Sequence, residues 1–113
     1  MNDNAVAEMS VEALRARLAA RADVQVADVQ VIDVREDWEW GQGHIAGAVH
    51  IPLSELPVRL GEIDVARAVA FICHLGGRSE LATRFARQHG ISRAANVVGG
   101  MDSWEARGYA VER

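Results

Sequence analysis

The sequence predicts an α/β fold in which a central, mainly parallel β-sheet is flanked by helices on both faces. Short apolar runs at 29–34 and 68–72 alternate along the chain with segments of helical spacing at 10–20 and 79–90. The run at 68–72, AVAFI, is apolar throughout, as in a strand that is covered on both sides. Strands that alternate with helices typically form a parallel sheet through right-handed crossovers. With 113 residues, half of them hydrophobic, we expect one domain over 1–113.

The first half of the chain predicts a helix, a buried strand, one helical turn followed by a glycine-rich loop, and a short strand, at 10–20, 29–34, 37–48 and 48–53. Ser10 suits the N-cap of the helix, whose apolar residues recur on one face. The buried strand is a β-branched run that polar residues bound at its end. Pro52 should stop the short strand because proline cannot donate to a sheet.

The second half predicts a short helix at 54–63, a strand and a helix at 68–72 and 79–90, and a second strand and helix at 94–98 and 99–108. The sequence contains no internal repeats. Ser54 is a possible cap of the short helix, which Pro57 could disrupt. The segment 79–90 has the clearest apolar face of the chain, and Gly90 follows its end. Gly108 closes the last helix in the same way.

Composition excludes several classes of function. The net charge of −4 and the scattered arginines indicate no nucleic-acid partner. All 12 basic residues are arginine, which excludes a Schiff-base lysine or a Walker-type phosphate lysine. The N-terminus lacks the pattern of a signal peptide, no apolar run is long enough to span a membrane, and a single cysteine suits a reducing compartment. We expect a cytoplasmic protein with no membrane partner.

The only cysteine, Cys73, follows the apolar strand 68–72 and precedes a glycine-rich loop, HLGGRS. Ligands of open parallel sheets gather at the carboxyl ends of the strands, which is where this cysteine falls. Gly76 and Gly77 allow the loop to curl so that successive backbone N–H groups face inward, and the start of a helix near Ser79 adds its dipole. With Arg78 at the rim, the loop predicts a cradle for an anion.

A lone cysteine at the end of an apolar strand is usually an inert core residue. Here the glycines, the arginine and the helix start that follow favour a nucleophile instead. Helix N-termini and nearby cations lower a cysteine pKa from about 8.5 to roughly 3.5–7.5. We therefore expect Cys73 to be an exposed thiolate at the floor of the cradle.

Four motifs occur in the order found in one known family: DVRE at 33–36, GHIAGAVHIPL at 43–53, CHLGGR at 73–78 and NVVGGMDSWEARG at 96–108. On these motifs the chain resembles the rhodanese-like domain family, whose active-site loop runs six residues from a catalytic cysteine. The resemblance covers about residues 10–110. It corresponds to a stand-alone, single-domain rhodanese.

The resemblance implies a sulfurtransferase of the thiosulfate sulfurtransferase type. Cys73 would take the outer sulfur of thiosulfate or a related small anionic donor as a persulfide and pass it to a thiophilic acceptor: a thiol, cyanide or a protein. The backbone of the active-site loop would bind the donor and the persulfide, through His74, Leu75, Gly76, Gly77, Arg78 and Ser79. Arg78 would position the charged oxygens of the donor. No metal or organic cofactor is implied.

Two alternatives stay open. Related phosphatases have a loop that is one residue longer between cysteine and arginine, so the CHLGGR loop should be too tight for phosphate. Rhodanese-like domains also serve as non-catalytic or regulatory binding modules, and the presence of Cys73 favours the enzyme over the module.

Other residues have weaker assignments. Asp33 and Arg35 end the strand beside the active loop, where they form either an ion pair that fixes the loops or a direct contact with substrate. His44 and His50 have no recognised ligand spacing, so we expect structural roles and no metal site. The tryptophans are assigned to packing at the edge of a small core: Trp38, Trp40 and Trp104.

Overall fold

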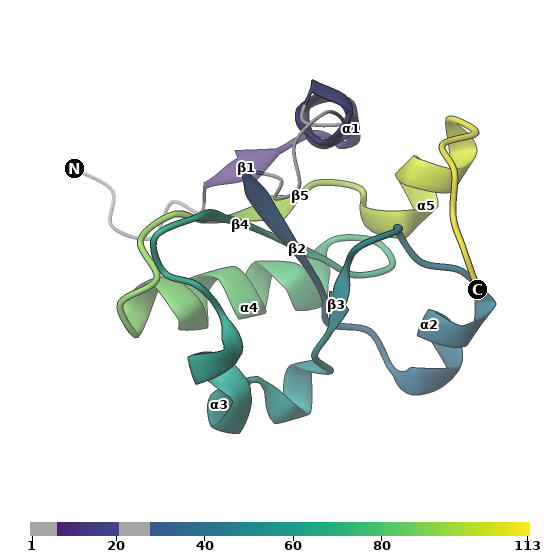
Figure 1. The fold of residues 1–113 in the computed structure, drawn as a ribbon. Helices are drawn as coiled ribbons and strands as arrows, with labels where there is room; N and C mark the ends of the chain where they lie inside the picture. The colour runs from purple at the N-terminus through teal and green to yellow at the C-terminus, as the bar shows by residue number, and fades with distance from the viewer. Residues whose placement is uncertain (1–6, 21–27) are drawn as a thin grey trace.

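The computed structural model describes residues 7–20 and 28–113, and within them five parallel strands form one sheet in the order β1-β5-β4-β2-β3 (Figure 1). The strands are β1 (Glu8–Met9), β2 (Val29–Asp33), β3 (Val49–His50), β4 (Ala68–Ile72) and β5 (Ala94–Val97). Their parallel pairing with intervening helices confirms the α/β prediction.

Helices cover both faces of the sheet, as Figure 1 shows. They are α1 (Val11–Ala20), α2 (Asp37–Gln42), α3 (Leu56–Arg59), α4 (Gly77–Gln88) and α5 (Gly100–Ala106), with short 3₁₀ turns at Leu53–Glu55 and Leu60–Glu62. α1 and α5 pack on one face and α3 and α4 on the other, because the residues they bury belong to two separate core clusters. α2 follows the end of β2 and so lies at the carboxyl edge of the sheet.

The central strand β4 contributes side chains to both core clusters. Val69 and Phe71 belong to the cluster that α4 covers, whereas Ala70 and Ile72 belong to the cluster of α1 and α5. Side chains of a strand alternate between the two faces of a sheet, so an apolar run of this kind requires cover on both sides. Cys73 continues the alternation and points toward the α4 side.

Some boundaries differ from the predicted ones. The two-residue strand β1 was not predicted, because two residues carry no periodicity; it forms by pairing with β5, at Glu8 with Asn96 and Met9 with Val97. Ser54 lies inside a 3₁₀ turn and does not cap a helix, and Pro57 takes one of the first positions of α3, where a proline needs no N–H partner. α4 begins at Gly77, two residues before Ser79.

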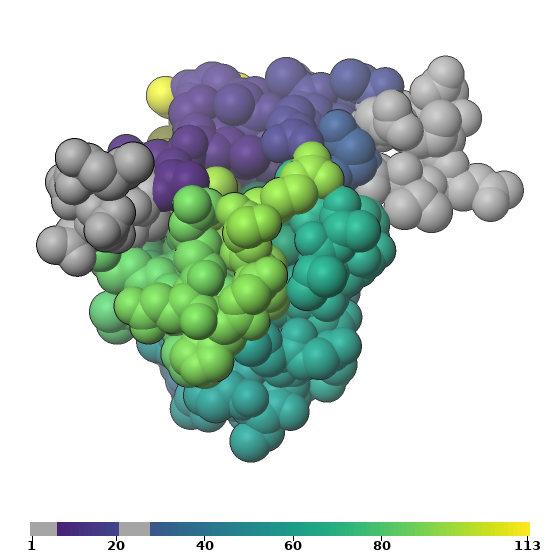
Figure 2. Space-filling model, turned by 90° about the vertical axis from the view of Figure 1, so that its left-hand side faces the viewer, coloured from purple at the N-terminus to yellow at the C-terminus, as the bar shows by residue number. Residues whose placement is uncertain are grey.

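The end of the molecule opposite Cys73 is formed by the amino ends of the strands. There, the segment that follows α3 (teal) lies against the end of α4 and the turn into β5 (green), as Figure 2 shows. Ile63 and Ile91 join the same core cluster from these two segments. Among the described helices, none has the length and apolar character needed to cross a lipid bilayer.

Candidate active site

Cys73 stands directly after β4, at the carboxyl end of the central strand. Neighbouring strands hold it firmly, since the N–H of Val34 donates to the carbonyl of Ile72 at 3.0 Å. The residue is only 1% exposed. The expectation of an exposed thiol was therefore wrong: the position is as predicted, but the side chain packs into the core cluster on the α4 side.

The loop after Cys73 turns back over the sulfur and donates hydrogen bonds to it. Gly76 has φ +118°, a conformation that side chains disfavour, and its N–H lies 3.1 Å from Sγ. The hydroxyl of Ser79, in the first turn of α4, lies 3.2 Å from Sγ. The curled, inward-facing loop that the glycines predicted is thus present.

These donors determine how readily the thiol ionises. Burial raises the pKa of Cys73, but hydrogen bonds from the Ser79 hydroxyl and from the backbone N–H groups of Ser79, Gly76 and Arg78 lower it more, so that the pKa lies below its ordinary value. Hydrogen bonds to the charged form of a group favour ionisation. The site thus favours a thiolate by donated hydrogen bonds, although the sulfur is buried.

Ser79 also contacts Asn96, a buried residue of β5. Its Oγ lies 2.6 Å from Oδ1 of Asn96 as well as 3.2 Å from Sγ of Cys73. A hydroxyl has a single proton, so the amide oxygen and the sulfur compete for it. Asn96 therefore influences the charge of Cys73 without touching it.

The start of α5 holds the loop from behind. The N–H groups of Met101 and Asp102 donate to the carbonyls of Cys73 and His74 at 2.8 and 2.9 Å. Gly100 makes this approach possible, because a Cβ at this position would lie 2.4 Å from the carbonyl oxygen of Cys73. Close contact between two segments of backbone thus explains Gly100, whereas a Cβ at its neighbour Gly99 would meet the side chain of Ser103.

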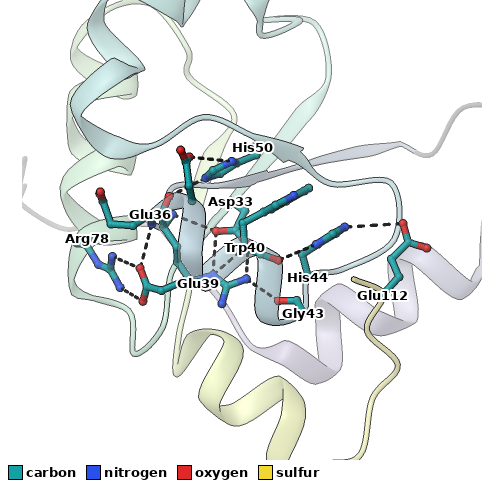
Figure 3. A network of polar contacts seen from close by, with 11 residues as sticks. Asp33, Glu36, Glu39, Trp40, Gly43, His44, His50, Arg78 and Glu112 are labelled. Carbon is teal, nitrogen blue, oxygen red and sulfur yellow. Dashed lines mark hydrogen bonds and ion pairs between the residues drawn. The ribbon is translucent and has the colours of Figure 1, made fainter.

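Arg78 at the rim of the loop does not stand free. Its Nη1 and Nη2 donate to the two carboxylate oxygens of Glu39 in α2, at 2.7 and 2.8 Å (Figure 3). The hydrogen bonds from Arg78 hold the pKa of Glu39 at about 2, and the same contact raises the pKa of Arg78. Glu39 also accepts from the N–H of Glu36 at 2.9 Å, which fixes the carboxylate in place.

Asp33 and Arg35 form a buried ion pair, with Nη2 of Arg35 2.8 Å from Oδ2 of Asp33. The same Nη2 donates to the carbonyl of Gly43 at 2.8 Å, so the pair ties the end of β2 to the end of α2. Of the two roles that the sequence left open, the ion pair that fixes the loops is therefore present. Neither residue is among those that form a hydrogen bond with the cysteine sulfur.

Two adjoining cavities open beside the cysteine. A smaller one of about 260 Å³, here called the sulfur cavity, is lined by Cys73, His74, Leu75, Gly77 and Arg78. His74 and Leu75 are exposed at its mouth. The larger one, of about 480 Å³ and here called the side groove, also includes His74 in its lining. Its other lining residues come from three segments: Arg35, Trp38, Glu39, Gln42, Glu105 and Arg113.

The histidines outside the loop have structural partners. Trp40 stacks between His44 and His50, with ring centroids 3.6 and 4.8 Å away (Figure 3). Nδ1 of His44 donates to the carbonyl of Trp40 at 3.0 Å, and Nε2 of His50 donates to that of Arg35 at 2.7 Å. In residues 7–20 and 28–113, no group of three or more potential metal ligands comes together.

The tryptophan assignments hold in part. Trp40 packs between the histidines, and Trp104 is buried with its indole N–H donating to the carbonyl of Ala110 at 3.0 Å. Packing was the wrong assignment for Trp38, which is 66% exposed and lines the side groove. The next residue of α2, Glu39, is buried, because successive side chains of a helix point in different directions.

The sequence analysis missed the residues that support the loop from other elements: Glu39, Asn96 and Gly100. Each of them comes close to the loop only through the fold, from α2, β5 and the start of α5. Two lay inside the motif at 96–108, and Glu39 lay in the glycine-punctuated turn. Their membership of these segments was the only available signal.

Comparison with known proteins adds independent evidence. The family model described as Rhodanese-like domain matches residues 10–107. A sulfurtransferase of Allochromatium vinosum is 34% identical over 106 residues, which cover 94% of each chain. YrkF of Bacillus subtilis, named as a candidate sulfur carrier protein, is 35% identical over 106 residues, and the chain spans only 55% of its length.

The structural comparison agrees. The crystal structure of a rhodanese-related protein from Thermoplasma volcanium superposes with a TM-score of 0.82 at 32% identity, over 94% of this chain and 97% of that one. The motifs, the loop geometry and the match over residues 10–107 lead to one conclusion: this chain belongs to the rhodanese-like domain family.

Proposed function

We propose that this chain is a sulfurtransferase that carries sulfur on Cys73 as a persulfide, from thiosulfate or a related anionic donor to a thiophilic acceptor. The single observation that carries the proposal is the set of hydrogen bonds that the loop donates to Sγ, which lowers the pKa of the thiol. The relatives named as a sulfurtransferase and a candidate sulfur carrier support a rhodanese-type role in sulfur transfer.

In the first half of the reaction, the thiolate of Cys73 attacks the outer sulfur of thiosulfate. A bond forms between Sγ and that sulfur, the S–S bond within thiosulfate breaks, and sulfite leaves with the electron pair. The product is a persulfide on Cys73, and no external oxidant or reductant is needed. A covalent intermediate of this kind divides a difficult transfer into two easier steps.

The loop stabilises the negative charge both before and after this step. The N–H of Gly76 and the hydroxyl of Ser79 stabilise the thiolate before attack. We expect the other backbone N–H groups of the curled loop to bind the terminal sulfur of the persulfide afterwards. Arg78 meets the sulfonate oxygens of the donor with the guanidinium N–H groups that Glu39 does not occupy. The ion pair with Glu39 holds that guanidinium at the rim of the sulfur cavity.

In the second half, a nucleophilic acceptor attacks the outer sulfur of the persulfide. The bond between that sulfur and Sγ breaks, and Cys73 returns as a thiolate. A thiol, cyanide or a sulfur-accepting protein could fill this role. A single thiol that must stay reduced suits a reducing compartment, and we propose that this compartment is the cytoplasm.

One observation favours a second candidate, a non-catalytic rhodanese-like binding module. The cysteine is 1% exposed, as an inert core thiol would be. Alkylation by a small neutral reagent at mildly acidic pH separates the two candidates. A thiolate of lowered pKa reacts quickly through the sulfur cavity, whereas a buried, protonated thiol does not.

The direct test is the intact mass of the reduced protein after exposure to thiosulfate and removal of the excess. The wild-type protein should gain one sulfur, cyanide should remove it, and Cys73→Ser should gain none. Ser92→Ala is a control at an exposed site outside the loop. No gain with thiosulfate and none with a persulfide donor would overturn the assignment in favour of the binding module.

A further inference from the structure

We propose that the side groove binds a peptide-sized thiol acceptor through its carboxylate and presents the thiol to the persulfide on Cys73. This inference rests on the proposed function, since it names the class of acceptor that the second half-reaction uses. The observation behind it is a buried arginine, Arg35, that has an unused donor group and lines the groove.

The bonding of Arg35 leaves one end of its guanidinium available. Nε donates to Asp33 at 3.0 Å, and Nη2 donates to Asp33 and to the carbonyl of Gly43, both at 2.8 Å. In the part of the chain that the structure describes, no group bonds to Nη1. The residue is 4% exposed and lines the groove, so Nη1 is the donor that it offers there.

A buried guanidinium held by a carboxylate on one side is a preorganised site for a second carboxylate. Its orientation is already fixed by Asp33 and Gly43, so binding costs little side-chain entropy. The two N–H groups of Nη1 remain for charge-assisted hydrogen bonds, which are strong with a carboxylate as the acceptor. The ligand that fits Nη1 of Arg35 therefore carries a carboxylate.

The size of the groove indicates a ligand larger than the usual small anions. The groove measures about 480 Å³, compared with about 260 Å³ for the sulfur cavity. Cyanide or sulfite would leave most of it empty, whereas a short peptide would fill it. The exposed indole of Trp38 supplies an apolar wall for such a ligand.

The charges in the groove suit a ligand with both a carboxylate and an ammonium group. Arg113 adds a second guanidinium, whose Nε donates to the carbonyl of Gln42 at 2.9 Å. Glu105 supplies a carboxylate to the lining, while Glu39 is already occupied by Arg78. Amino-acid and peptide thiols have this pair of charges.

The groove also leads to the reacting sulfur. His74 lines both the groove and the sulfur cavity, so the two adjoin at this residue. A thiol bound with its carboxylate at Arg35 extends past His74 toward Cys73. As a thiolate it attacks the outer sulfur of the persulfide, the bond to Sγ breaks, and the acceptor leaves as a persulfide while Cys73 regains its thiolate.

The kinetic test uses glutathione and its diester, which share the thiol and the peptide but differ in the free carboxylates. With thiosulfate as donor, we expect the KM for the diester to exceed that for glutathione by about tenfold in the wild-type protein. Arg113→Gln should reduce this ratio by about threefold, because it removes an exposed charge from the groove. Trp38→Ala should raise both KM values and leave their ratio unchanged. Arg93→Gln, an exposed arginine at the far end of the sheet, should behave as wild type.

The binding test separates this inference from the proposed function. Cys73→Ser contains no thiol, so calorimetry can measure how it binds glutathione without any sulfur chemistry. Tighter binding of glutathione than of the diester supports the groove even if no persulfide forms on the wild-type protein. A persulfide that forms and transfers to glutathione and the diester with equal KM, together with equal binding to Cys73→Ser, overturns the inference and leaves the sulfurtransferase intact.

Discussion

Arg78 and Glu39 face each other at the rim of the sulfur cavity, joined by hydrogen bonds of 2.7 and 2.8 Å. They come from α4 and α2, which are separated along the chain by the strands β3 and β4 and the helix α3. The pair therefore links the active-site loop to the helix that lines the side groove. It also determines the charge that an incoming anionic donor encounters, because the carboxylate of Glu39 partly neutralises the guanidinium of Arg78.

This ion pair predicts a dependence of stability on acidity. The pKa of Glu39 is about 2 in the folded protein against 4.5 for the free group, so the pair stabilises the fold fully above pH 4.5 and loses its effect as the pH falls toward 2. Because Arg78 is partly exposed, we expect Glu39→Gln to cost about 1–2 kcal/mol at neutral pH. Urea unfolding of both proteins from pH 7 to pH 3 should show the difference shrinking below pH 4.5; a constant difference would contradict the prediction.

Arg78 itself should matter for charged donors more than for neutral reagents. In Arg78→Ala we expect the KM for thiosulfate to rise by about tenfold, since a charge-assisted hydrogen bond to the sulfonate is lost. The rate of alkylation of Cys73 by iodoacetamide, which is uncharged, should change much less. Steady-state kinetics and alkylation rates measure the two effects, and equal losses in both would count against a role in donor binding.

Ser79 should control the ionisation of Cys73. Ser79→Ala removes the side-chain hydrogen bond that lowers the pKa of the thiol, so we expect that pKa to rise. The pH profile of alkylation measures this directly, because Cys73 is the only cysteine. Ser92→Ala, an exposed serine outside the site, should leave the profile in place. An unshifted profile in Ser79→Ala would mean that the backbone donors alone hold the thiolate.

Replacing Asn96 should shift the pKa of Cys73 in the opposite direction. Its amide oxygen competes with the sulfur for the hydroxyl proton of Ser79. In Asn96→Leu, which keeps a similar volume, that proton has only Sγ as an acceptor, so the pKa of Cys73 should fall below the wild-type value. The same alkylation profile tests this, and a rise in pKa would show that Asn96 orients Ser79 toward the sulfur instead of competing with it.

Gly100 should tolerate no side chain. Gly100→Ala places a Cβ 2.4 Å from the carbonyl oxygen of Cys73 at a φ of +57°, so the start of α5 must move away from the loop. We expect a loss of about 2 kcal/mol or more in the free energy of unfolding. Gly41→Ala is the matched control, since it meets no atom within 4 Å and lies inside α2. It should gain about 0.5–1 kcal/mol in the same urea titration, and similar losses in both variants would contradict the steric argument.

Local patterns in the sequence were sufficient for much of this protein. The apolar run of β4, the spacing of α4 and the glycines after Cys73 predicted the parallel sheet and the curled loop, because each depends on neighbours in sequence. The four motifs identified the family, which the match over residues 10–107 confirms. The geometry of the loop followed from backbone freedom at Gly76, which is itself a local property.

The burial of the thiol, the partner of Arg78 and the side groove came only from the tertiary structure. Glu39, Asn96 and Gly100 reach the loop from three elements whose approach depends on the order of strands in the sheet. Periodicity and capping indicate which secondary structure a segment forms and which of its faces is buried. They carry no information about which distant side chains contact that segment. The charge on the sulfur and the shape of the pocket around it are set by those distant contacts, so they become visible only when the chain is folded.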